Sequence, residues 1–168
     1  MNNTYEELQA EACRDGIEIV DNYPFESDKI HGLYCENTIA IGKNAKTNAE
    51  KACILAEELG HHYTTTGDIL DQSKAVNRQQ EQKARTWAYF RQISLCDLVS
   101  AYRYGCRNQF EIADYLGVTE QFLTDALKRF KEKYGIYATC NNYVIYFEPL
   151  GVLEVYSLLN KGGSSYDD

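Results

Sequence analysis

Ala56-Glu57-Glu58-Leu59-Gly60-His61-His62 is the stretch that decides the fold of this chain. At about 3.6 residues per turn, Glu57 and His61 share one face of a helix, and Glu58 stands beside them. Thr47 and Glu50 form a capping box that predicts where this helix begins. Its apolar residues recur at three- and four-residue steps and should face the core: Ala52, Leu55, Ala56, Leu59 and Tyr63.

Two residues four apart on a helix, with a carboxylate next to the first, are typical of the helix on which zinc peptidases hold their metal. In that pattern Glu57 and His61 bind the ion and Glu58 is the general base. A third ligand is needed, and Glu81 in a later helical segment can supply it. Taken alone, the pattern also fits a surface helix with two glutamates and two histidines, so both interpretations stay open.

His62 offers a second register, because Glu58 and His62 are also four residues apart. Leu59 would then take the position of the base, and hydrolysis would lose its proton acceptor. We therefore prefer Glu57 and His61 as ligands, and expect His62 to pack beside them or to orient a ligand. Asp68, in the following loop, either orients one of the histidines or caps that loop.

The chain has 168 residues, 44% hydrophobic and 25% charged, which suits one globular domain. Its net charge of −8 argues against a general nucleic-acid binder, because phosphate neutralisation needs a surplus of Lys and Arg. No apolar run is long enough to span a bilayer, and residues 1–6 lack the features of a signal peptide. Six cysteines are scattered without a close pair, so we expect buried free thiols and a cytosolic protein.

The remaining pattern predicts one α+β domain over residues 1–159, with a disordered tail at 160–168. A first helix should run from Thr4 to about Gly16, and a β-hairpin should pair residues 31–35 with 38–42. Further helices are expected at 77–92, 94–105, 109–116 and 119–134. A second hairpin should pair residues 137–139 with 143–147.

Three blocks of sequence resemble a known family: residues 55–63, Gly67-Asp68-Ile69 and residues 81–89. In order and spacing they are similar to the ImmA/IrrE metallo-endopeptidases of phages and mobile elements, over residues 30 to 135. The resemblance implies a zincin-like metallopeptidase domain with a small antiparallel sheet beside the motif helix. It also implies Glu57, His61 and Glu81 as ligands of Zn, and Glu58 as general base for a metal-bound water. Members typically cleave phage-type repressors, so the expected partner is a repressor-like regulatory protein, not a membrane or nucleic acid.

The chain departs from the family pattern at two positions, with Glu57 in place of the usual first His and Arg85 where Asn is common. Two carboxylates and one imidazole neutralise a divalent ion fully, whereas two imidazoles and one carboxylate leave it positive. A more neutral ion acidifies its water less, and oxygen-rich ligation favours harder ions such as Mn. We therefore expect a slower or metal-shifted peptidase, with an inactive relative that binds the repressor as the alternative.

The first hairpin has a second predicted role, because a strand edge beside a metal-binding helix can bind an extended peptide by β-addition. The candidate substrate strand runs from Leu33 to Ile41 and includes Ile39. The alternative is a sheet edge whose own turn prevents it from pairing with a peptide.

Residues 109–134 resemble a helix-turn-helix, with Gly117 at the turn and Thr119 as the cap of the second helix. A DNA-reading helix presents Arg, Lys, Asn or Gln near its start, and here only Gln121 suits that role. The basic residues come late on the helix, where they also complement its dipole. We predict structural support from this helix pair and assign no DNA-binding residues.

Overall fold

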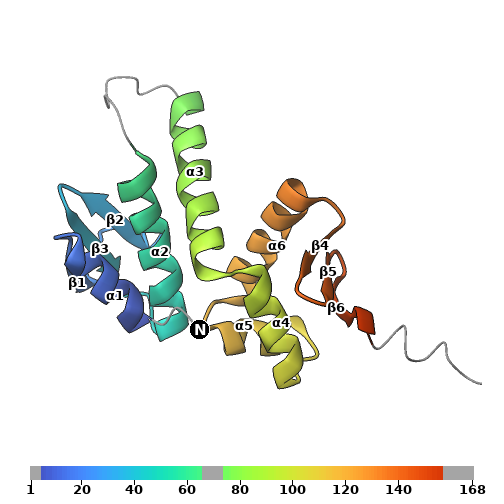
Figure 1. Ribbon diagram of the computed structural model, residues 1–168. Coiled ribbons are helices and arrows are strands. Elements are labelled where there is room, and N and C mark those ends of the chain that lie inside the picture. The colour runs from blue at the N-terminus through green and yellow to red at the C-terminus, as the bar shows by residue number, and fades with distance from the viewer. Residues whose placement is uncertain (1–4, 66–73, 157–168) are drawn as a thin grey trace, which may run out of the picture.

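The computed structural model describes residues 5–65 and 74–156 and shows a mixed α+β chain. The first half contains a helix, a three-stranded sheet and the motif helix: α1 Tyr5–Arg14, β1 Glu18–Tyr23, β2 Gly32–Cys35, β3 Thr38–Gly42 and α2 Asn48–Thr64. The second half contains four helices and another sheet: α3 Lys74–Gln92, α4 Leu95–Tyr104, α5 Gln109–Leu116, α6 Glu120–Tyr134, β4 Tyr137–Cys140, β5 Tyr143–Phe147 and β6 Leu150–Glu154. In Figure 1 the long helix α3 stands between the two halves, beside α2 and facing α6.

The first sheet has the strand order β1-β3-β2. The predicted hairpin is confirmed, since β2 and β3 pair antiparallel across Glu36 and Asn37, which both have positive φ angles. Strand β1 was not predicted, and it pairs with β3 in parallel, with a register shift between Val20 and Tyr23. The expectation of a purely antiparallel sheet is therefore wrong, and β3 is the central strand.

The second sheet is antiparallel, in the order β4-β5-β6. Its first two strands are the predicted hairpin around Asn141, whose φ angle is positive. The prediction stopped at a hairpin, but β6 adds a third strand through register pairs such as Ile145 with Val152.

Capping residues set the helix boundaries where the sequence predicted them. Thr47 with Glu50 and Ser94 with Asp97 both form complete capping boxes. The helices α4 and α5 end at Gly105 and Gly117, whose left-handed backbone a glycine adopts without a Cβ penalty. Helix α3 begins at Lys74, earlier than the predicted Asn77. The predicted start at Thr4 and the predicted tail at 160–168 lie outside the described residues.

One hydrophobic core cluster joins the two halves of the chain. It includes Leu8 of α1, Ile39 of β3, Leu59 of α2, Phe130 of α6 and Ile145 of β5, all with exposed fractions of 1% or less. None of the helices within the described ranges is both long and apolar enough to cross a membrane.

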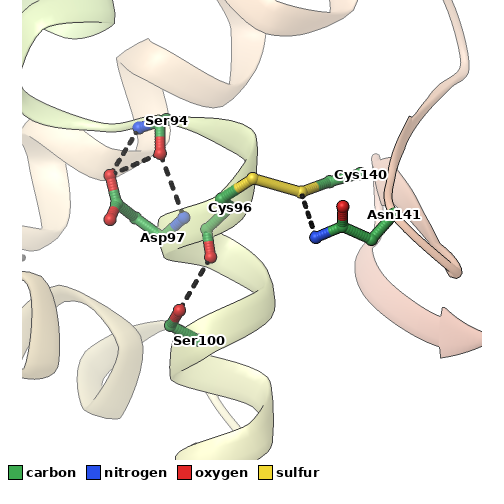
Figure 2. Close-up of a disulfide and its surroundings, with 6 residues drawn as sticks. All are labelled: Ser94, Cys96, Asp97, Ser100, Cys140 and Asn141. Atoms are coloured by element: carbon green, nitrogen blue, oxygen red, sulfur yellow. Dashed lines mark hydrogen bonds between the residues drawn. A yellow bond between two sulfur atoms is a disulfide. The ribbon is translucent and has the colours of Figure 1, made fainter.

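A disulfide between Cys96 and Cys140 ties the start of α4 to the end of β4 (Figure 2). The expectation that the cysteines are free thiols is wrong for this pair, because the packing of α4 against β4 brings together two residues 44 positions apart. Cys13, Cys35, Cys53 and Cys106 are free, and only Cys53 is fully buried.

Candidate metal centre

The centre is built where the helices α2 and α3 cross at very short range. A Cβ added at Gly60 of α2 would lie 2.3 Å from the carbonyl oxygen of Ala84 in α3, so the two backbones approach more closely than any side chain at 60 would allow. Ala84 is itself fully buried. The helices run antiparallel, because residue 61 faces residue 81 whereas residue 57 faces residue 85.

His61 and Glu81 are brought together by this crossing. The His61 Nε2 and Glu81 Oε1 atoms are 3.4 Å apart, and the two side chains are 22% and 54% exposed. In a tetrahedral zinc site with bonds of about 2.1 Å, neighbouring ligand atoms stand about 3.4 Å apart. The pair therefore has the spacing of two ligands on one ion, with solvent access for a further ligand.

Glu57, the third predicted ligand, is turned toward Arg85 of α3. Arg85 Nε lies 3.9 Å from Glu57 Oε2, with exposed fractions of 56% and 35%. Burial raises the pKa of the Glu57 carboxyl above its ordinary value, and the Arg85 guanidinium opposes that rise. A cation therefore already holds the carboxylate that the metal would need.

Glu58 projects from α2 toward the strand β2. Its carboxylate accepts a hydrogen bond from the backbone N–H of Tyr34, and a Cβ at Gly32 would lie 2.7 Å from its Oε1 atom. Burial raises the pKa of Glu58 to about 7, and the negative charges of Glu57 and Glu81 act in the same direction. A carboxyl group with a pKa near 7 is suited to accept and release a proton at neutral pH.

His62 also faces β2. Its Nδ1 atom shares a 2.8 Å hydrogen bond with the Tyr34 hydroxyl, and its ring packs edge-on against the rings of Tyr34 and Tyr63. The alternative register would require His62 to give up its hydrogen bond with Tyr34. Glu57 and His61 stay the predicted ligands, and His62 is held in a packed position. Asp68 lies outside the described residues, so its predicted role stays a prediction.

The first sheet has β1 and β2 at its two edges, because β3 is paired on both sides, and β2 is the edge that carries the Glu58 contact. The prediction that Ile39 and Ile41 contact a substrate strand is corrected here, since both are fully buried in β3. Leu33 on β2 is 52% exposed and remains available. The carbonyl of His31 accepts from Gly42, so the alternation of an antiparallel ladder leaves the backbone groups of Gly32 and Tyr34 facing outward.

A metal fits this donor set in part. Within residues 5–65 and 74–156, no group of three or more His, Cys, Asp or Glu side chains is arranged to hold a metal ion. His61 and Glu81 have suitable chemistry and spacing, whereas Glu57 has to leave Arg85 to join them. The sequence did not predict the ion pair between Glu57 and Arg85. It also did not predict that the missing side chain of Gly32 leaves space for the Glu58 carboxylate. An isolated glycine inside a helical pattern, as at position 60, was the signal for a close helix crossing.

A cavity of about 550 Å³ lies between α3 and α6, next to the centre. Both Glu81 and Arg85 line it, and its other wall includes Asp125 and Lys128 of α6. The centre therefore adjoins a space with charged walls of both signs.

The cap of α6 contacts the motif helix, whereas the body of α6 packs against α3. Thr119, the cap of α6, lies against Cys53 of α2, with its backbone nitrogen 3.5 Å from the sulfur. Gln121, the one residue suited to reading DNA, donates instead to Asp125. The contact of Thr119 with Cys53 and the engagement of Gln121 favour the structural role of this helix pair.

The comparison with protein families gives one match, the IrrE N-terminal-like domain, a peptidase family, over residues 14–128. No curated protein and no solved structure matches the chain significantly. The matched residues include the whole of α2 and α3 and the first sheet, which together form the centre described above. The chain belongs to the IrrE N-terminal-like family of metallopeptidase-like domains.

Proposed function

We propose that this protein is a metal-dependent endopeptidase of zincin-like architecture, and that its substrate is a repressor-like protein of a phage or mobile element. The observation that carries the proposal is the position of Glu58. Its carboxylate lies at the outward edge of β2, on the helix that also carries His61 against Glu81. A proton acceptor, a pair of metal donors and a free strand edge are thereby gathered at one helix.

His61, Glu81 and, after leaving Arg85, Glu57 would hold the ion, with Zn or Mn as the candidates. The bound metal would supply Lewis-acid activation of water and of the scissile carbonyl. Glu58 takes the proton of the attacking water and passes it to the leaving amine, a task suited to its pKa of about 7.

The strand β2 positions the peptide. An extended segment can pair with the outward backbone groups of Gly32 and with the carbonyl of Tyr34, and lay its side chains against Leu33. The peptide bond nearest Tyr34 then lies beside the Glu58 carboxylate, which accepts from that residue's N–H. Phage-type repressors act on DNA, so a cytoplasmic location is part of this proposal.

The test is cleavage of a repressor-like protein encoded beside this chain, with added Zn or Mn and with a chelator. The parent should cut in the presence of metal, and Glu58→Gln should bind the same metal without cutting. Cleavage that survives the Glu58→Gln substitution would exclude Glu58 as the proton acceptor. Cleavage that is insensitive to the chelator would exclude metal dependence.

The second candidate is a non-catalytic relative that binds the repressor without cutting it. The contact between Glu57 and Arg85 favours it, because one ligand is already engaged by a cation. Metal analysis of the purified parent and of Glu57→His separates the two. A parent that binds its partner and holds no metal, beside a substituted protein that gains metal, supports the non-catalytic candidate.

A DNA-binding regulator using residues 109–134 is the weakest candidate, since Gln121 is engaged by Asp125. A shift assay at low salt should show no tight binding.

A further inference from the structure

We propose, resting on the metal-dependent function above, that Arg85 is a positioning residue that sets the metal affinity of this centre by holding the Glu57 carboxylate. The two side chains form an ion pair, with Arg85 Nε 3.9 Å from Glu57 Oε2. A metal that takes Glu57 as a ligand has to compete with the guanidinium for this carboxylate. The free energy of the ion pair is subtracted from the free energy of metal binding.

The contact is built into the same crossing that makes the centre. Glu57 and His61 are one turn apart on α2, and Glu81 and Arg85 are one turn apart on α3. The antiparallel helices therefore bring together two side-chain pairs, His61 with Glu81 and Glu57 with Arg85. The close approach of Gly60 to Ala84 lies between these two pairs and fixes the distance between the helices at both.

Arg85 also opposes the metal by its charge. One helical turn separates it from Glu81, so a divalent ion between His61 and Glu81 binds near a fixed positive group. A neutral side chain at this position would neither engage Glu57 nor repel the ion. Both effects of Arg85 therefore weaken metal binding.

The guanidinium has room to leave. Arg85 is 56% exposed and lines the cavity of about 550 Å³ between α3 and α6. Asp125 lines the same cavity, where its carboxylate accepts from Gln121 and pairs with Lys128. Release of Glu57 thus needs a rotation of one exposed side chain and leaves the core packing intact.

The experiment measures Zn and Mn affinity of the full chain by chelator competition. Arg85→Gln should tighten binding by about three- to fivefold, as expected when a partly exposed ion pair is removed. Arg85→Lys keeps a cation and should stay within about twofold of the parent. Lys83→Gln is the matched control, since it removes the same charge from α3 two residues away and should leave affinity unchanged.

A Glu57→Gln background shows whether the effect passes through that carboxylate. There, Arg85→Gln should gain clearly less affinity than in the parent background. An equal gain in both backgrounds, or equal affinities for the parent and Arg85→Gln, overturns the proposal. If the parent binds metal and cleaves while Arg85→Gln binds no more tightly, the positioning role fails and the peptidase function stands. If the parent, Arg85→Gln and Glu57→His all bind no metal, both fail.

Discussion

Substituting Gly60 by Ala should push α2 and α3 apart at the centre. The new Cβ would lie 2.3 Å from the Ala84 carbonyl oxygen, whereas ordinary contact begins near 3.4 Å. The obstacle is backbone, so no side chain can rotate to relieve it, and the helices have to separate by about 1 Å. Overpacking of this kind costs about 1–3 kcal/mol, while the better helix propensity of Ala returns about 1 kcal/mol. A net loss of about 1 kcal/mol in the free energy of unfolding is expected.

The consequence for the centre is larger than the loss of stability. The distance of 3.4 Å between His61 Nε2 and Glu81 Oε1 would grow by about the same 1 Å, beyond the spacing of two bonds of about 2.1 Å to one ion. Metal affinity should fall by at least tenfold, which corresponds to about 1.4 kcal/mol.

Urea unfolding measures the stability, and chelator competition measures the metal affinity. Gly151→Ala is the matched control, because a Cβ at Gly151 would meet nothing within 4 Å. It should leave metal affinity unchanged and should not lower the stability, since Ala loses less backbone entropy than Gly in a strand. A Gly60→Ala protein that is more stable than the parent and binds metal equally well would refute the close crossing as the basis of the centre.

Three further predictions concern the base, the register and the disulfide. Gly32→Ala should displace the Glu58 carboxylate, because an Oε1 atom of Glu58 lies 2.7 Å from the new Cβ. The cleavage rate should fall by about 100-fold while metal affinity stays unchanged. Equal cleavage rates for the parent and Gly32→Ala would show that Gly32 does not position Glu58. His61→Ala should abolish metal binding, whereas His62→Ala should keep it and lose about 1 kcal/mol with the Tyr34 hydrogen bond; the reverse result would favour the other register. Alkylation of the unfolded chain without reductant should label four cysteines, and with reductant six, as counted by mass spectrometry; six labels in both cases would exclude the Cys96–Cys140 bond.

Local chemistry made much of the fold predictable. The capping boxes at Thr47 and Ser94 and the turn at Glu36-Asn37 depend on residues within a few positions of one another, and all three are confirmed. Strand β1 is different, because residues 18–23 alternate poorly and their partner β3 is parallel and is reached only after β2. The bond between Cys96 and Cys140 is equally non-local, and sequence spacing carries no information about it.

The residues of the centre were likewise predictable only where the prediction depended on local sequence. The helical period predicted that Glu57 and His61 share a face, and the family resemblance supplied Glu81 as their partner, which the structure places beside His61. The period does not say which residue of α3 meets Glu57, because that depends on how closely the two helices approach. The contact with Arg85 follows from a glycine at the crossing, and it bears directly on whether the centre takes up metal.

The disulfide closes a covalent ring around one part of the chain, and the rest of the chain lies outside that ring. The covalent ring runs from residue 96 to residue 140 and contains α5 and α6. Every side chain of the centre, from Glu57 to Arg85, precedes that ring. Reducing surroundings would therefore loosen the scaffold under the motif helix and leave the covalent connections of the donors themselves untouched.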